Sequence, residues 1–66
     1  MAAYYVDIAA QPSGEHEVHK QGCESMPRSK TYLGDFASCA PAIEAAKQRY
    51  RKVDGCAVCS PDCHKR

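Results

Sequence analysis

The chain has very few large apolar side chains: no Trp, one Phe and a single Leu among 66 residues. Much of its 44% hydrophobic content is therefore Ala and Cys. A chain of this length buries only about 60% of the surface that its unfolded form exposes. Because a core of small side chains contributes about 3 to 5 kcal/mol at best, we expect a disulfide or a bound metal ion to stabilise the fold.

A long apolar run is also lacking. No stretch approaches the roughly 18 apolar residues of a membrane-spanning helix. Residues 1–7 carry neither the basic nor the apolar region of a secretory signal peptide. We therefore expect a cytoplasmic protein that does not enter a membrane. Thiols stay reduced in the cytoplasm, which favours closely spaced cysteines as metal ligands or redox centres, and an odd count of five would leave one cysteine unpaired in an all-disulfide scheme.

The net charge of +1 is close to zero, but most of the positive excess lies in residues 47–52. Cations in the last turn of a helix complement its dipole, and this is the favoured interpretation. A strip that contacts phosphates is the alternative, with Lys47, Arg49, Arg51 and Lys52 around Tyr50. Nucleic-acid-binding domains usually carry a larger basic excess, which disfavours nucleic acid as a partner.

Metal-ligand residue types are concentrated near the C-terminus, where Cys56, Cys59, Cys63 and His64 fall within nine residues. The two-residue spacing of Cys56 and Cys59 allows both thiolates to reach one ion at about 2.3 Å. Cys63 follows after a turn that contains a proline. We therefore expect these three cysteines to bind a divalent ion, with zinc as the expected cofactor.

The spacing leaves the fourth ligand open. His64 adjoins Cys63, and neighbouring residues rarely both reach one ion without strain. Cys23, in the loop after the second expected strand, is therefore slightly favoured over His64, and His19 is the third candidate. His16 and His19 lie three apart on that strand, so they point to opposite faces of a sheet and are not expected to share an ion.

Cys39 lies at the N-terminus of the expected helix, where the helix dipole lowers the pKa of a thiol. This position could hold a reactive thiol. The favoured interpretation is that its sulfur packs against the sheet. A disulfide from Cys39 to Cys23 or to Cys56 under oxidising conditions is a further alternative.

Alternating apolar residues predict a strand over residues 3–9, and the turn sequence at residues 11–14 predicts a hairpin to a second strand over residues 15–20. A third strand is expected over residues 31–36, after a loop rich in Gly, Pro and Ser. The helix that follows begins after Ser38. Its apolar face is formed by residues at helical spacing, namely Ile43, Ala46, Tyr50 and Val53. The Asp-Gly pair at residues 54–55 is expected to end it.

The sequence therefore predicts an α+β fold of order β-β-β-α, in which one helix packs on a three-stranded antiparallel sheet. Residues 1–54 form the body, and the Cys-rich residues 55–66 dock on it within a single domain. The function that this pattern favours is a structural zinc site without a catalytic centre. A thiol redox or metal-transfer protein is the first alternative, and a small nucleic-acid-binding module is the second. An unidentified protein is the favoured kind of partner, nucleic acid is a disfavoured alternative, and no membrane contact is expected. The chain is expected to be a monomer or a weak dimer.

Overall fold

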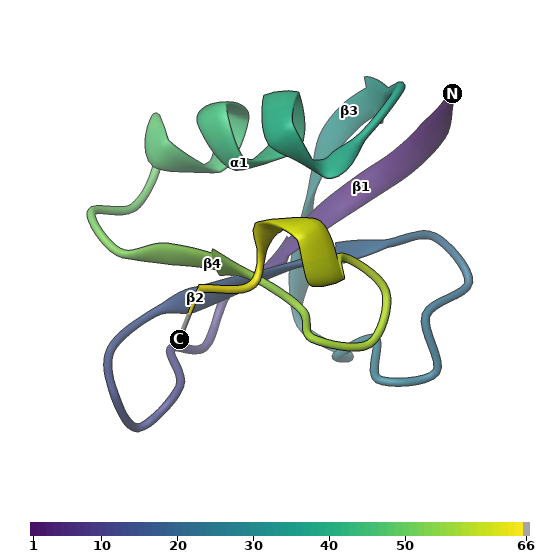
Figure 1. Cartoon of the computed structure of the whole chain (residues 1–66). Coiled ribbons are helices and arrows are strands. Elements are labelled where there is room, and N and C mark those ends of the chain that lie inside the picture. The colour runs from purple at the N-terminus through teal and green to yellow at the C-terminus, as the bar shows by residue number, and fades with distance from the viewer. Residues whose placement is uncertain (66) are drawn as a thin grey trace.

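The computed structural model describes residues 1–65. These residues form an α+β fold in which one helix lies across one face of a four-stranded sheet (Figure 1). In chain order the elements are β1 (Ala2–Asp7), β2 (His16–Lys20), β3 (Lys30–Phe36), α1 (Cys39–Lys47), β4 (Val53–Gly55) and the single 3₁₀ turn η1 (Pro61–Cys63). Within this part of the chain, no helix has the length and apolar character needed to cross a membrane.

The sheet is mixed, with the strand order β3-β1-β2-β4. Strand β1 pairs antiparallel with both β2 and β3, whereas β4 runs parallel to β2. The α+β class expected from the sequence is confirmed, but the expected three-stranded antiparallel sheet is wrong because it omits β4. This strand has only three residues, Val-Asp-Gly, and so carries too short a pattern to be recognised.

The helix is shorter than the apolar spacing predicts, because it ends at Lys47. Ser38 is its N-cap residue as expected, although the Ser38 side chain makes no capping hydrogen bond. Beyond the helix, the ring of Tyr50 stacks on the ring of His16 with centroids 3.7 Å apart. Val53 then pairs with His16 in the sheet. These two contacts direct residues 50–53 to the edge of the sheet, so their helical spacing reflects burial against the core and not a continued helix.

The core lies between the sheet and α1. Its sheet side is formed by Tyr4, Val6 and Val18, and its helix side by Ala42 and Ala46, all of them buried. The two alanines have small side chains, which lets the helix approach the strands closely. Side chains alternate along a strand, so the residues between these core positions point to the face of the sheet away from the helix.

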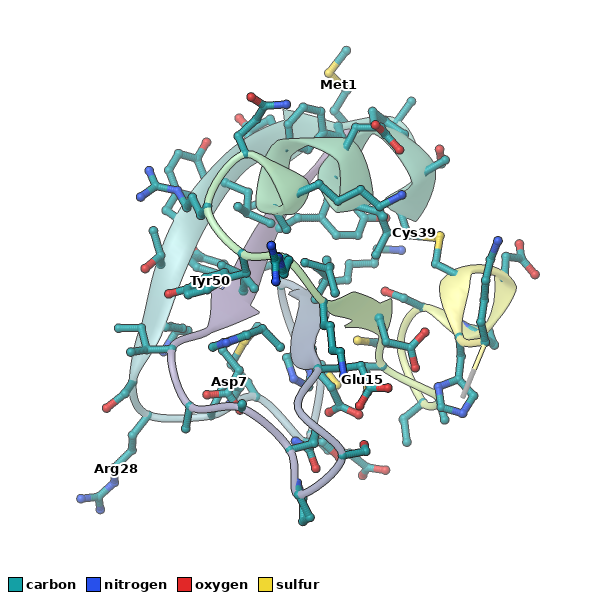
Figure 2. All side chains as sticks on the ribbon, turned by 90° about the vertical axis from the view of Figure 1, so that its left-hand side faces the viewer. Met1, Asp7, Glu15, Arg28, Cys39 and Tyr50 are labelled. Atoms are coloured by element: carbon teal, nitrogen blue, oxygen red, sulfur yellow. A yellow bond between two sulfur atoms is a disulfide. The ribbon has the colours of Figure 1, made fainter. Side chains whose placement is uncertain are left out.

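A disulfide joins Cys39, at the first turn of α1, to Cys63 in η1 (Figure 2). The expectation that Cys39 packs against the sheet is confirmed, because Cys39 is buried in the core cluster with Tyr4 and Val18. Its sulfur is also bonded to Cys63, so the alternative pairings with Cys23 and Cys56 are wrong. The backbone at Gly55 fits tightly beneath this link. A Cβ atom there would lie 2.7 Å from the Cβ of Cys63 and 2.9 Å from the carbonyl oxygen of Ser60.

We expect the disulfide to contribute about 3 to 4 kcal/mol to the free energy of unfolding, because it closes a loop of some two dozen residues in the unfolded chain. The double substitution Cys39→Ser and Cys63→Ser should lower the urea midpoint accordingly. Wild-type protein with the disulfide selectively reduced should unfold at the same midpoint as the double variant. Equal stability of the oxidised wild type and the double variant would contradict this prediction.

We also expect Gly55→Ala to destabilise the fold by about 1 to 3 kcal/mol, since the added methyl group would overlap Cys63 and Ser60. Thermal unfolding measures this loss. The control is Ala57→Ser, at an exposed position two residues further on, which should change stability by no more than about 0.5 kcal/mol. Equal effects of the two substitutions would show that the close approach at Gly55 does not constrain the fold.

Candidate metal centre

Three cysteines and one histidine from distant parts of the chain meet at the ends of β2 and β4. One ligand atom from each of His19, Cys23, Cys56 and Cys59 lies within 4.8 Å of all the others. The Cys23 and Cys56 Sγ atoms are 3.9 Å apart, as are Cys59 Sγ and His19 Nδ1. Two thiolates bound at about 2.3 Å to one tetrahedral ion would lie about 3.8 Å apart. The group therefore has the dimensions of a four-coordinate metal site.

The parallel pairing of β2 and β4 creates this cluster. Val18 lies opposite Gly55 in the register of the two strands. Parallel strands end at the same edge of a sheet. The residue after Val18 is His19 and the residue after Gly55 is Cys56, so His19 and Cys56 lie next to each other. Cys23 and Cys59 come from the turns that follow these two strands. One half of the site, His19 and Cys23, thus comes from the end of β2 and the turn after it. The other half, Cys56 and Cys59, comes from the segment directly after β4.

Backbone N–H groups surround the three sulfur atoms. Lys20 N–H donates to Cys59 Sγ at 3.2 Å, and Ser25 N–H donates to Cys23 Sγ at 3.4 Å. Val58 N–H donates to Cys56 Sγ at 3.4 Å. Hydrogen bonds to the charged form of a group favour that form, and similar bonds orient the ligands of metal sites. Each thiol is therefore held in place by the peptide backbone of its own or the neighbouring turn.

The imidazole of His19 is oriented for binding through Nδ1. Its Nε2 atom lies 3.6 Å from a carboxylate oxygen of Glu17, while Nδ1 faces the Cys59 sulfur. A histidine ligand commonly directs its second nitrogen to a carboxylate in this way. Burial lowers the pKa of His19, and the nearby carboxylates of Glu17 and Asp7 only partly oppose this effect. The ring is thus neutral at pH 7 and keeps a lone pair for a cation.

The thiols of Cys23 and Cys59 differ in acidity. Burial, with further contributions from the neighbouring thiols, raises the pKa of Cys23 to about 11. Burial also acts to raise the pKa of Cys59, but the hydrogen bonds from Lys20 N–H and from neighbouring side chains outweigh it, and the pKa falls below its ordinary value. In the absence of a cation, a negative charge in the cluster is therefore favoured on Cys59.

The structure brings together three of the cysteines that the sequence pattern suggests, Cys23, Cys56 and Cys59. His19, the third-ranked candidate for the fourth position, completes the group. Cys63 does not join it, because η1 turns the chain back toward α1 and the Cys63 sulfur is bonded to Cys39. The disulfide therefore separates Cys63 from the other cysteines of the expected ligand set.

His64 also lies apart from the cluster. Its Nδ1 atom is 3.0 Å from the carbonyl oxygen of Gly55 and 3.1 Å from Oδ2 of Asp54, a buried carboxylate. The backbone N–H of Lys65 donates to the other oxygen of the same carboxylate at 2.8 Å. These contacts fasten the residues after η1 to β4. His64 is therefore placed as a link between the C-terminal segment and the sheet.

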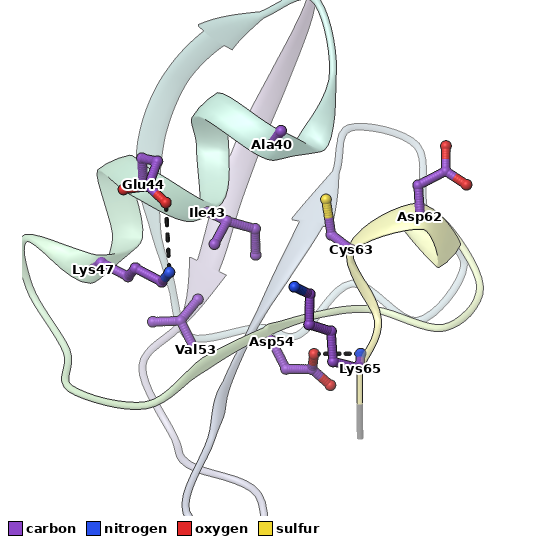
Figure 3. Close-up of a pocket in the computed structure, with 9 residues that line it drawn as sticks. All are labelled: Ala40, Ile43, Glu44, Lys47, Val53, Asp54, Asp62, Cys63 and Lys65. Atoms are coloured by element: carbon purple, nitrogen blue, oxygen red, sulfur yellow. Dashed lines mark hydrogen bonds and ion pairs between the residues drawn. The ribbon is translucent and has the colours of Figure 1, made fainter.

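A separate hollow of about 290 Å³ lies between α1 and the C-terminal segment (Figure 3). Ile43 and Val53 give it an apolar side, and Lys47 and Glu44 pair at 3.4 Å on its rim. The disulfide-bonded Cys63 lines this hollow. None of the four clustered residues lines it. The two features are thus independent sites on the molecule.

Comparison with models of protein families, with curated proteins and with solved structures finds no match for this chain. The class of site therefore rests on its own geometry. A small α+β fold presents three cysteine sulfurs and one imidazole at the ends of two parallel strands, within the dimensions of a single ion. This arrangement is a candidate Cys₃His metal centre.

The burial of His19 predicts a pH dependence for the stability of the metal-free protein. The pKa of His19 is lower in the folded than in the unfolded state, whose value is about 6.5. The unfolded chain therefore takes up the proton first as pH falls. The stability contributed by neutral His19 is present above about pH 6.5 and is lost below it, as pH falls through the folded-state pKa.

Urea unfolding with excess chelator at pH 5, 6 and 7 tests this dependence. The difference in free energy of unfolding between wild type and His19→Gln should be largest at pH 7 and should shrink toward pH 5. Each protein contains the other two histidines, so their titration cancels in the difference. A difference that stays constant across this range would contradict the prediction.

Proposed function

We propose that this protein binds one zinc ion through His19, Cys23, Cys56 and Cys59, and that the ion stabilises the fold. The observation that carries the proposal is the convergence of four ligand atoms within 4.8 Å of one another. Thiolates and imidazole are the ligands of tetrahedral zinc sites, whereas magnesium and calcium prefer oxygen ligands. A set of three sulfurs and one nitrogen therefore favours zinc.

The number and burial of the ligands favour a structural over a catalytic role. Four protein ligands fill a tetrahedral site, while catalytic zinc sites keep one position open for water or substrate. His19 and Cys56 are only 2% and 3% exposed. An ion at this position would join the turn after β2 to the segment after β4, two parts of the chain that are more than thirty residues apart.

Because the hydrophobic core is small, such an ion would contribute a large part of the free energy of unfolding. The fully buried large side chains are limited to Val6, Val18 and His19 within the described residues. Zinc binding to finger peptides supplies apparent free energies of about 10 kcal/mol or more, which exceeds the contribution expected from a core of this size. The ion and the Cys39–Cys63 disulfide would together hold the C-terminal segment from two sides.

A thiol redox role is the second candidate, and one observation favours it. Cys59 and the disulfide-bonded Cys39 line the same hollow, of about 210 Å³. A thiolate at Cys59 could attack the disulfide from there. Alkylation distinguishes the two functions, because zinc-bound thiolates resist the reagent until the metal is removed, whereas exchange-active thiols react rapidly.

The zinc proposal predicts one zinc ion per chain in protein purified without chelator, measured by elemental analysis and by native mass spectrometry. Removing the ion without reducing the disulfide should lower the melting temperature and change the amide NMR spectrum. His19→Gln should weaken zinc binding about tenfold or more, because it removes a ligand. The matched control is His16→Gln. The ring of His16 stacks on Tyr50, and His16 is not one of the four clustered residues, so this variant should keep full stoichiometry.

A zinc-to-protein ratio near zero would overturn the proposal. Unchanged melting temperature and NMR spectrum after chelation would overturn the structural role alone. Equal loss of zinc in both histidine variants would show that the assignment of His19 as a ligand is wrong.

A further inference from the structure

The four clustered residues differ in their exposure to solvent. His19 and Cys56 are buried, whereas Cys23 and Cys59 are half-buried. Both half-buried residues line one open hollow of about 380 Å³ on the surface. Its walls are the turn of residues 20–24 on one side and Val58 with Cys59 on the other. Solvent in this hollow therefore reaches two of the three sulfur atoms of the cluster.

We propose that this hollow is a binding site for small thiols, through which the protein exchanges its zinc ion with a soluble thiol ligand. The inference rests on the zinc site proposed above and adds an activity to it. Small-molecule sites commonly have volumes of about 300 to 1,000 Å³, so the hollow can hold a ligand the size of a short thiol peptide. A thiol is also the incoming ligand that suits an ion already bound by thiolates.

Cys23 is the ligand that leaves first. It belongs to an exposed turn, in which Gly22 adopts a φ of +90° and has open space around its Cα. Cys56, by comparison, follows β4 directly, and its backbone N–H donates to Val18 in the sheet at 3.0 Å. Movement of the turn can carry the Cys23 sulfur away from the ion without disturbing the sheet.

The exchange step balances without a redox partner. The incoming thiol forms a new sulfur–zinc bond as the bond between zinc and the Cys23 sulfur breaks. The proton of the incoming thiol passes to the Cys23 thiolate, and zinc remains divalent. A second exchange of the same kind at Cys59 would prepare the ion for release to the soluble ligand.

The experiment uses the zinc-loaded full chain, with its disulfide intact, and a coloured zinc chelator that reports transfer. The transfer rate should increase with glutathione concentration. Gln21→Trp and Val58→Trp place a large side chain on opposite walls of the hollow and leave the backbone N–H groups in place. Each should lower the thiol-dependent rate roughly fivefold or more by filling the site, while zinc stays at one per chain. Ile8→Trp, at another exposed apolar position, is the matched control and should not change the rate.

The charge of the residues that line the hollow allows a second, independent test of the exchange site. Gln21 and Glu24 both line the hollow. With anionic glutathione, Gln21→Glu should slow the exchange about twofold and Glu24→Lys should accelerate it by a similar factor. Neither variant should alter exchange with neutral 2-mercaptoethanol. Intact mass at the end of each run verifies that the disulfide persists, which separates exchange at the zinc site from reduction of the disulfide.

Zinc content, measured before the kinetics, separates failure of this inference from failure of the zinc site itself. Protein that carries no zinc would overturn both. Zinc-loaded protein whose thiol-dependent rate is the same in wild type and both Trp variants would overturn only the exchange site. Charge variants that act equally on anionic and neutral thiols would also count against entry through the hollow.

Discussion

The parallel pairing of β4 with β2 is the interaction on which the rest of this structure depends. It places Val18 opposite Gly55, and so makes neighbours of His19 and Cys56. The same pairing directs the chain after β4 beneath the first turn of α1. There the backbone of Gly55 lies close enough to Cys63 that even a methyl group would not fit. One short strand thereby positions both the candidate metal centre and the disulfide.

The disulfide and the candidate metal centre both lie where apolar packing is weakest. The helix contacts the sheet largely through small side chains such as Ala42 and Ala46, and α1 has only nine residues. The segment after β4 contributes little to this core and includes the exposed Val58. A disulfide at the start of the helix holds this segment, and the ion proposed at the ends of β2 and β4 would hold it further, without a larger core. Of the four residues of the candidate centre, His19 and Cys56 are buried, whereas Cys23 and Cys59 are partly open to solvent.

Much of the fold followed from local patterns. Alternation and turn signals predicted the first three strands, and Ser38 predicted where the helix begins, because these signals act over a few residues. The end of the helix could not be predicted in the same way. Tyr50 and Val53 continue the helical spacing, yet their burial comes from contacts with His16, which precedes them by more than thirty residues.

The sequence by itself determined that Cys56 and Cys59 would lie side by side, since a two-residue spacing keeps two thiols within reach of one ion in almost any turn. It also indicated Cys23 as a partner from the body of the chain. Only the tertiary structure decided that Cys63 bonds to Cys39 and that His19 takes the remaining position in the cluster. These outcomes depend on the register of a parallel strand pair and on the direction of the final turn. Neither is encoded in the spacing of neighbouring residues, because both arise from contacts between segments far apart in the chain.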